Sequence, residues 1–179
     1  MELAQGLLPL ASALILQARN SAAASEKQNA AAALRLAYPH LVSPENTKGG
    51  SLIAAAANLR AELRRAFPGH KFRVTTERFA GGDSLHVGWT DGPASSRVEA
   101  IADKYQPGYF DGMTDSYNYD QSAWNICFGQ AKFVQVRRNY SPALTAWARE
   151  PGNWEEERPR WAELQNLNIK AVKKPDAAQ

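Results

Sequence analysis

Carboxylates and tyrosine hydroxyls gather in one segment of the chain, residues 110–120, which reads FDGMTDSYNYD. The segment lacks the ligand spacing and the closing glutamate of a calcium loop, so its acids are poorly arranged to hold a divalent ion. Carboxylates can instead pair with arginines and lysines of a partner, and tyrosines are frequent anchors of protein interfaces. We therefore predict a partner-binding acidic loop made of Asp111, Asp115, Tyr117, Tyr119 and Asp120.

Charge is divided unevenly along the chain. Residues 83–120 hold seven acids and two bases, a balance of −5, whereas residues 60–78 hold six bases and two acids, a balance of +4. The net charge of the whole chain, +3, is too small to establish a nucleic-acid partner, although a pI near 9.1 is compatible with one. A two-sided domain and an ordinary solvated surface of mixed charge both fit this distribution.

The basic residues indicate a second candidate site. Alternation in the expected strand over residues 71–78 puts Arg73 on the face opposite Val74. Alternation in the last expected strand puts Arg137 on the same open face, opposite Val134. A basic sheet face with one aromatic ring suits nucleic acid, and it is also what a solvated sheet face looks like. The nucleic-acid alternative rests on Arg60, Arg64, Arg73 and Arg137.

Patterns typical of catalysis, metal binding and nucleotide binding are absent from the sequence. The histidines His40, His70 and His86 are scattered, and there is no zinc spacing, P-loop, GxGxxG or GxSxG motif. The single cysteine, Cys127, lies between isoleucine and phenylalanine, which favours a small buried apolar residue over a nucleophile. A lone cysteine also fits a reducing cytoplasm. We expect no enzyme activity, no catalytic residue, no metal and no cofactor.

The first part of the chain is apolar and then rich in alanine. Residues 3–17 carry no basic n-region, and the run is too short to span a bilayer, so we expect a buried or partner-facing helix rather than a signal peptide. Residues 21–37 predict a second helix that ends before a Tyr-Pro pair. Helices with so few large side chains must pack on something, and the apolar one could supply the face of a homodimer.

The middle of the chain predicts an α+β domain with the order helix, strand, strand, helix, strand. A helix begins with Ser51 as its N-cap, and a Gly-Gly turn near residue 81 joins the first two strands. We expect a small antiparallel sheet covered by helices, with extra helices before and after it. The expected divisions are an N-terminal helical segment (1–48), the α+β core (49–141), and a C-terminal helical extension with a frayed tail (142–179).

Four runs in the core resemble a known family. They are AELRRAFPGHKFRV, SLHVGWTDGP, FDGMTDSYNY and AKFVQVRRNYS. In this order they resemble the large polyvalent protein-associated domain family, specifically its twenty-ninth member, over about residues 58–141. The resemblance implies an accessory protein of phages, plasmids and other mobile elements that protects incoming DNA from host defence. It brings no catalytic residue with it.

Two functions follow as expectations. The first is a non-catalytic inhibitor of host defence, of the anti-CRISPR or antirestriction type, that binds a defence protein or ribonucleoprotein complex in the cytoplasm of the host bacterium. The second is an accessory protein that binds nucleic acid through the basic face. Neither involves a membrane.

Overall fold

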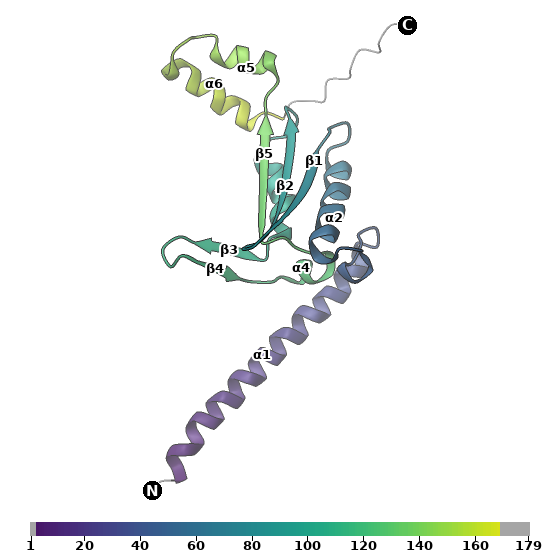
Figure 1. The fold of residues 1–179 in the computed structure, drawn as a ribbon, viewed down its shortest axis with the longest axis vertical. Helices are drawn as coiled ribbons and strands as arrows, with labels where there is room; N and C mark the ends of the chain where they lie inside the picture. The colour runs from purple at the N-terminus through teal and green to yellow at the C-terminus, as the bar shows by residue number, and fades with distance from the viewer. Residues whose placement is uncertain (1–2, 169–179) are drawn as a thin grey trace.

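The computed structural model describes residues 3–168, with side chains from residue 13 onward. It contains a three-stranded sheet, a separate two-stranded sheet, and helices that precede, cover and follow them (Figure 1). The predicted frayed tail over residues 170–179 lies outside the described residues. In chain order the elements are α1 (Leu3–Ala37), η1 (Pro44–Asn46), α2 (Gly50–Ala66), β1 (Arg73–Phe79), β2 (Gly82–Thr90), α3 (Ser95–Ala102), η2 (Asp103–Tyr105), β3 (Gly108–Asp111), β4 (Ser116–Tyr119), α4 (Ala123–Phe128), β5 (Phe133–Asn139), α5 (Pro142–Arg149) and α6 (Trp154–Asn166).

The central sheet has the order β1–β2–β5. β1 and β2 pair antiparallel, with Val74 opposite Val87. β5 pairs parallel to β2, with Val136 opposite Val87. The α+β class and the small sheet that the sequence predicts are confirmed. The parallel pairing arises because the long connection between β2 and β5, which carries α3 and α4, returns the chain to the edge where β2 begins.

Helices cover one face of the central sheet and leave the other open (Figure 1). Leu59 and Leu63 of α2 are fully buried in one cluster with Val87 and Trp89 of β2, and α3 adds Val98. Burying each large aliphatic side chain contributes about 1.5–3 kcal/mol, so this cluster is the main source of stability. The open face carries the alternate side chains of the three strands, which are Arg73, Thr75, Glu77, Phe79, Ser84, His86, Phe133, Gln135 and Arg137.

The start of α2 differs from the expectation. Its N-cap is Gly49, and the hydroxyl of Ser51 instead accepts a hydrogen bond from the backbone N–H of Gln130 at 2.9 Å. The adjacent Gly129 has φ +88°, and a Cβ there would overlap the carbonyl of Ser51. Only glycine allows this close approach, which holds the end of α4 against the first turn of α2.

Residues 3–37 form one helix, α1, and the expectation of two helices is wrong. No glycine or proline lies between the two predicted segments to end the first one. The last turns of α1 dock on α4, where Ala31 is buried and its carbonyl accepts a hydrogen bond from Cys127. Residues 13–30 are exposed, and α1 extends away from the sheet (Figure 1). The dimer contact predicted for the apolar helix stays a prediction.

None of the described helices is both long enough and apolar enough to cross a membrane. The C-terminal helices α5 and α6 lie within the helical extension expected over residues 142–179, at the end of the sheet opposite α1 (Figure 1). Arg138 of β5 attaches them, because its guanidinium donates to the backbone carbonyls of Leu164 at 2.7 Å and Leu167 at 2.8 Å. It also donates to the carbonyls of Asp91 and Gly92, so one side chain joins three segments.

Candidate partner-binding surface

The segment predicted as an acidic loop is a β-hairpin. β3 and β4 pair antiparallel, with Tyr109 opposite Asn118 and Phe110 opposite Tyr117. Gly108 begins the hairpin with φ +155°, and a Cβ there would overlap the carbonyl of Asn118, so a glycine is needed where the strands meet. The hairpin projects sideways from one end of the central sheet (Figure 1). Because an isolated two-stranded hairpin is marginally stable, contacts with the rest of the domain must support it.

Asp111 and Asp115 shape the tip of the hairpin. The Asp111 carboxylate accepts a hydrogen bond from the backbone N–H of Met113 at 2.9 Å, and this bond holds the pKa of the Asp111 carboxyl below its usual range. Asp115 adopts a left-handed backbone with φ 49°, which aspartate tolerates better than most residues. The Asp115 side chain is exposed. Both acids therefore fit the backbone of the turn, and both add negative charge to the surface of the tip.

Tyr117 attaches the hairpin to the central sheet. Its hydroxyl donates a hydrogen bond to the backbone carbonyl of Lys132 at 2.6 Å, and its ring meets Phe133 edge-on with a centroid distance of 5.6 Å. The Lys132 ammonium lies 5.3 Å from the centroid of the Tyr117 ring. Burial raises the pKa of the Tyr117 hydroxyl, with a smaller contribution from the neighbouring Tyr119. Tyr117 is thus a half-buried support of the predicted site.

An aromatic strip runs from the hairpin onto the open face of the central sheet. Phe79 of β1 stacks on Phe133 of β5, with centroids 6.2 Å apart and an interplanar angle of 23°. Phe133 contacts Tyr117, whose ring centroid lies 4.6 Å from that of Tyr119. Phe110 lies opposite Tyr117 on the same side of the hairpin. We call these residues the aromatic strip: Phe79, Phe110, Tyr117, Tyr119 and Phe133.

The strip and its neighbours expose much of their apolar surface. The exposed fractions are 45% for Phe79, 54% for Phe110 and 65% for Tyr119. On the other side and tip of the hairpin, Tyr109 is 62% exposed and Met113 is 97% exposed. Phe79, Phe110 and Met113 were not among the predicted site residues. Residues 108–111, which read GYFD, show no alternation of apolar and polar side chains, so no local pattern marked this strand.

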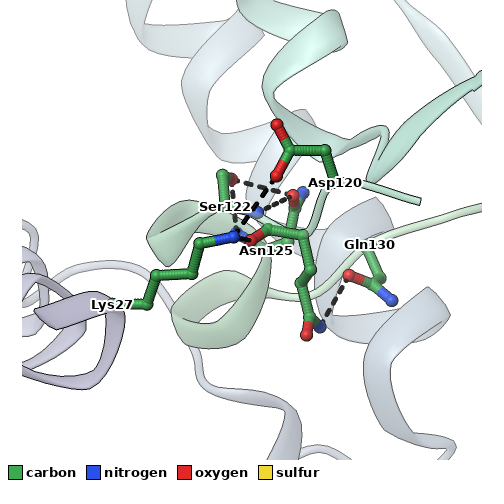
Figure 2. Close-up of polar contacts among 6 residues, drawn as sticks. Lys27, Asp120, Ser122, Asn125 and Gln130 are labelled. Atoms are coloured by element: carbon green, nitrogen blue, oxygen red, sulfur yellow. Dashed lines mark hydrogen bonds and ion pairs between the residues drawn. The ribbon is translucent and has the colours of Figure 1, made fainter. Parts of the chain in front are cut away.

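Asp120 faces α1 rather than the tip. Figure 2 shows the side chain of Lys27 reaching the Asp120 carboxylate, with 3.2 Å between Nζ and Oδ1, and Lys27 also donates to the carbonyl of Gln121 at 2.8 Å. Ser122 and Asn125 beside this contact form the capping box that starts α4. The Asp120 side chain is 85% exposed, so the ion pair contributes little to stability. Asp120 marks the junction of α1 with the hairpin.

The arginines of the nucleic-acid alternative fall on two separate surfaces. Arg73 and Arg137 are both exposed and lie in one row of the open face, each paired with Gly88 between them. Arg60 and Arg64 belong to α2, which covers the opposite face of the sheet. The structure therefore does not join the four arginines into one patch.

Within residues 13–168, no group of three or more histidine, cysteine, aspartate or glutamate side chains converges to hold a metal ion. Cys127 is fully buried, and burial raises the pKa of its thiol, which opposes a nucleophilic role. Glu62 of α2 accepts hydrogen bonds from Lys104 at 2.6 Å and from the Tyr105 hydroxyl at 2.5 Å. This network joins η2 to α2, and burial raises the pKa of Tyr105 well above its usual range.

The elements define a small α+β domain with one open sheet face and a projecting aromatic hairpin. The chain belongs to the family described as large polyvalent protein associated domain 29, whose model matches residues 51–141. This finding confirms the resemblance drawn from the sequence. The match begins in the first turn of α2 and ends just after β5, so it includes the hairpin but excludes α1, α5 and α6. Comparisons with curated proteins and with solved structures found no match.

Proposed function

We propose that this protein is a non-catalytic accessory protein of a mobile genetic element, and that it inhibits a host defence system by binding one of its protein complexes. The contact surface is the β3–β4 hairpin together with the aromatic strip. The protein acts in the cytoplasm of the host bacterium, where such complexes meet incoming DNA. The observation that carries the proposal is the cluster of large apolar side chains exposed on the hairpin.

These apolar side chains are concentrated rather than scattered. Single exposed apolar residues are ordinary on protein surfaces, but a contiguous patch rimmed by polar residues is typical of an interaction site. Phe110, Tyr119 and Met113 all lie on one short hairpin and are each more than half exposed. Because the core lies between α2, α3 and the central sheet, folding does not require these side chains to be apolar.

Charge on the hairpin favours a basic partner. The tip carries Asp111 and Asp115, and the backbone N–H of Met113 lowers the pKa of the Asp111 carboxyl further below neutrality. Carboxylates next to exposed aromatic rings can pair with arginines while the rings pack on their neighbours. A defence complex that grips nucleic-acid phosphates presents such arginines and lysines, so its nucleic-acid-binding groove is the surface that the hairpin would occupy.

Capture from a lysate with matched variants tests the proposal. The double variant Phe110→Ser with Tyr119→Ser removes the apolar patch, and Trp154→Ser removes a similarly exposed aromatic side chain from α6. Tagged proteins are incubated with nuclease-treated lysate of a strain that carries an active CRISPR or restriction system. We expect the wild type and Trp154→Ser to retain the same defence complex, and the double variant to retain at least about tenfold less. Equal retention by all three proteins would contradict the proposal.

Nucleic-acid binding is a second candidate function. It is favoured by the exposed row of Arg73 and Arg137 on the same open face as Phe133. Phosphate contacts release counterions, so binding of single-stranded or double-stranded probes should weaken steeply between low and moderate salt. The variant Arg73→Gln with Arg137→Gln should reduce that salt dependence. An absence of binding to DNA and RNA at low salt would remove this candidate.

A further inference from the structure

We infer that a basic pocket at the C-terminal end of α2 binds the phosphate group of a nucleotide-sized phosphate ester. The pocket has a volume of about 340 Å³. It is formed where the Pro68-Gly69 turn folds the chain back from α2 into β1, which brings residues of the helix next to the segment that precedes the strand. Its walls are Arg60, Arg64, His70, Lys71 and Phe72.

The pocket is partly built by contacts that fix its walls. The Arg60 guanidinium donates a hydrogen bond to the carbonyl of Val74 at 2.6 Å, which fixes the end of the side chain and leaves its other N–H groups for a ligand. Phe72 is half-buried and its ring centroid lies 5.7 Å from that of Phe67 and 5.7 Å from that of Trp89. The ring of Phe72 and the guanidinium of Arg60 are therefore both held in place by contacts with the rest of the domain.

The positive charge of the pocket is not neutralised by the protein. Among residues 13–168, none of the pocket's arginine, lysine and histidine side chains has a carboxylate within 4.0 Å. The acid nearest in sequence on α2, Glu62, is engaged by Lys104 and Tyr105 instead. Arginine in the last turn of a helix complements the negative end of the helix dipole, which accounts for Arg64. It does not account for Lys71, which lies outside the helix, or for Arg60, which precedes the last turn.

The lining selects the class of ligand. Guanidinium groups present paired N–H donors that match the oxygens of a phosphate, and a lysine ammonium adds a point charge. Phe72 offers an apolar surface to whatever the phosphate is attached to, such as a sugar or a base. The volume lies at the lower end of the range for small-molecule sites, which suits a mononucleotide or one nucleotide of a strand.

This site is separate from the hairpin. The pocket adjoins the first residue of β1, whereas Phe79 of the aromatic strip is the last residue of that strand. Seven residues of extended strand place the two about 20 Å apart. The inference therefore does not rest on the proposed function, and either can fail without the other.

Binding of defined phosphate probes to the full chain tests the inference. Isothermal titration calorimetry is carried out with inorganic phosphate, adenosine monophosphate, adenosine and a deoxyadenosine pentanucleotide. The test variant is Arg64→Gln with Lys71→Gln. The matched control is Arg65→Gln with Lys48→Gln, which removes the same charge from exposed positions outside the pocket. Thermal unfolding of both variants checks that each is folded.

We expect adenosine monophosphate to bind more tightly than adenosine, because the phosphate makes charge-assisted hydrogen bonds. The test variant should lose about tenfold or more in affinity, and the control should stay within about twofold of the wild type. Similar affinities for the mononucleotide and the pentanucleotide would identify a free nucleotide as the ligand, whereas a stronger pentanucleotide would identify a strand. Equal losses in both variants, or no preference for the phosphate over adenosine, would overturn the inference.

Discussion

The two antiparallel hairpins of this chain differ in how far they bury the large apolar side chains named below. The β1–β2 hairpin lies under α2 and buries Leu85, Val87 and Trp89 almost completely. The β3–β4 hairpin leaves Phe110 and Tyr119 more than half exposed. Both alternate their side chains at period two, so the difference lies in what covers them. The first hairpin has a helix and a third strand to pack against, whereas the second is attached mainly at its base.

The difference between the two hairpins indicates which large apolar side chains stabilise the fold and which are available to bind a partner. A large apolar side chain in the β1–β2 hairpin stabilises the domain by leaving water during folding. An equivalent side chain in the β3–β4 hairpin remains in water until something binds it. Substitutions in the two hairpins should therefore affect different measurements.

The largest expected effect is on stability, from Leu85→Ala in β2. Leu85 is fully buried, so its truncation leaves a cavity in the core between α2 and the central sheet. The free energy of unfolding should fall by about 2–5 kcal/mol. Urea unfolding followed by circular dichroism measures the change. A loss below about 1 kcal/mol would mean that this hairpin is not part of the main core.

A smaller effect is expected where the β3–β4 hairpin is attached to the start of β5. Tyr117→Phe removes the hydroxyl that donates to the Lys132 carbonyl and leaves that acceptor without this donor. The free energy of unfolding should fall by about 1 kcal/mol, and amide hydrogen exchange in the β3–β4 hairpin should accelerate. Tyr109→Phe, which removes a hydroxyl from an exposed side chain on the other side of the hairpin, is the control. Equal effects of both variants would contradict the role given to Tyr117.

The double variant Phe110→Ser with Tyr119→Ser should change stability little. Both side chains are mostly exposed, and surface substitutions of this kind usually stay within about 0.5 kcal/mol. Thermal unfolding measures the change. A decrease of about 2 kcal/mol or more would place the aromatic strip in the fold and remove the distinction between the hairpins.

The smallest effect concerns pH and the hairpin tip. The Met113 N–H lowers the pKa of Asp111 in the folded protein, so this bond stabilises the tip above the pKa of the unfolded chain. The stabilisation is lost as pH falls through the lower pKa of the folded state. In NMR titrations, the Asp111 carboxyl should therefore titrate at a lower pH in the folded protein than in urea. Identical midpoints would show that the bond is not formed.

The sequence predicts the central sheet well because the side chains on one face of its strands pack in the core, which requires apolar residues at alternate positions. Val74, Val87 and Val136 share one face of three neighbouring strands, as their alternation indicates. The β3–β4 hairpin was missed because its strands have four residues each and carry glycine, aspartate and serine at positions where loops also carry them. Local pattern cannot distinguish such a hairpin from a loop when its side chains are not buried.

Contacts between distant parts of the chain account for the rest of what was missed. Phe79 and Phe133 are far apart in sequence, and only the pairing of β1 and β5 with β2 brings their rings together. Asp120 belongs to the acidic segment by sequence, yet its neighbour in space is Lys27 of α1. The separation of Arg60 from Arg137 likewise depends on which face of the sheet α2 covers.

The most direct test of the central claim is the efficiency of phage plaquing on a bacterial strain with an active defence system that expresses each protein. We expect the wild type and Trp154→Ser to restore plaquing, and Phe110→Ser with Tyr119→Ser to fail to restore it, although this double variant is folded and equally abundant. Full restoration of plaquing by the folded double variant would contradict the claim that the β3–β4 hairpin is the surface with which this protein acts.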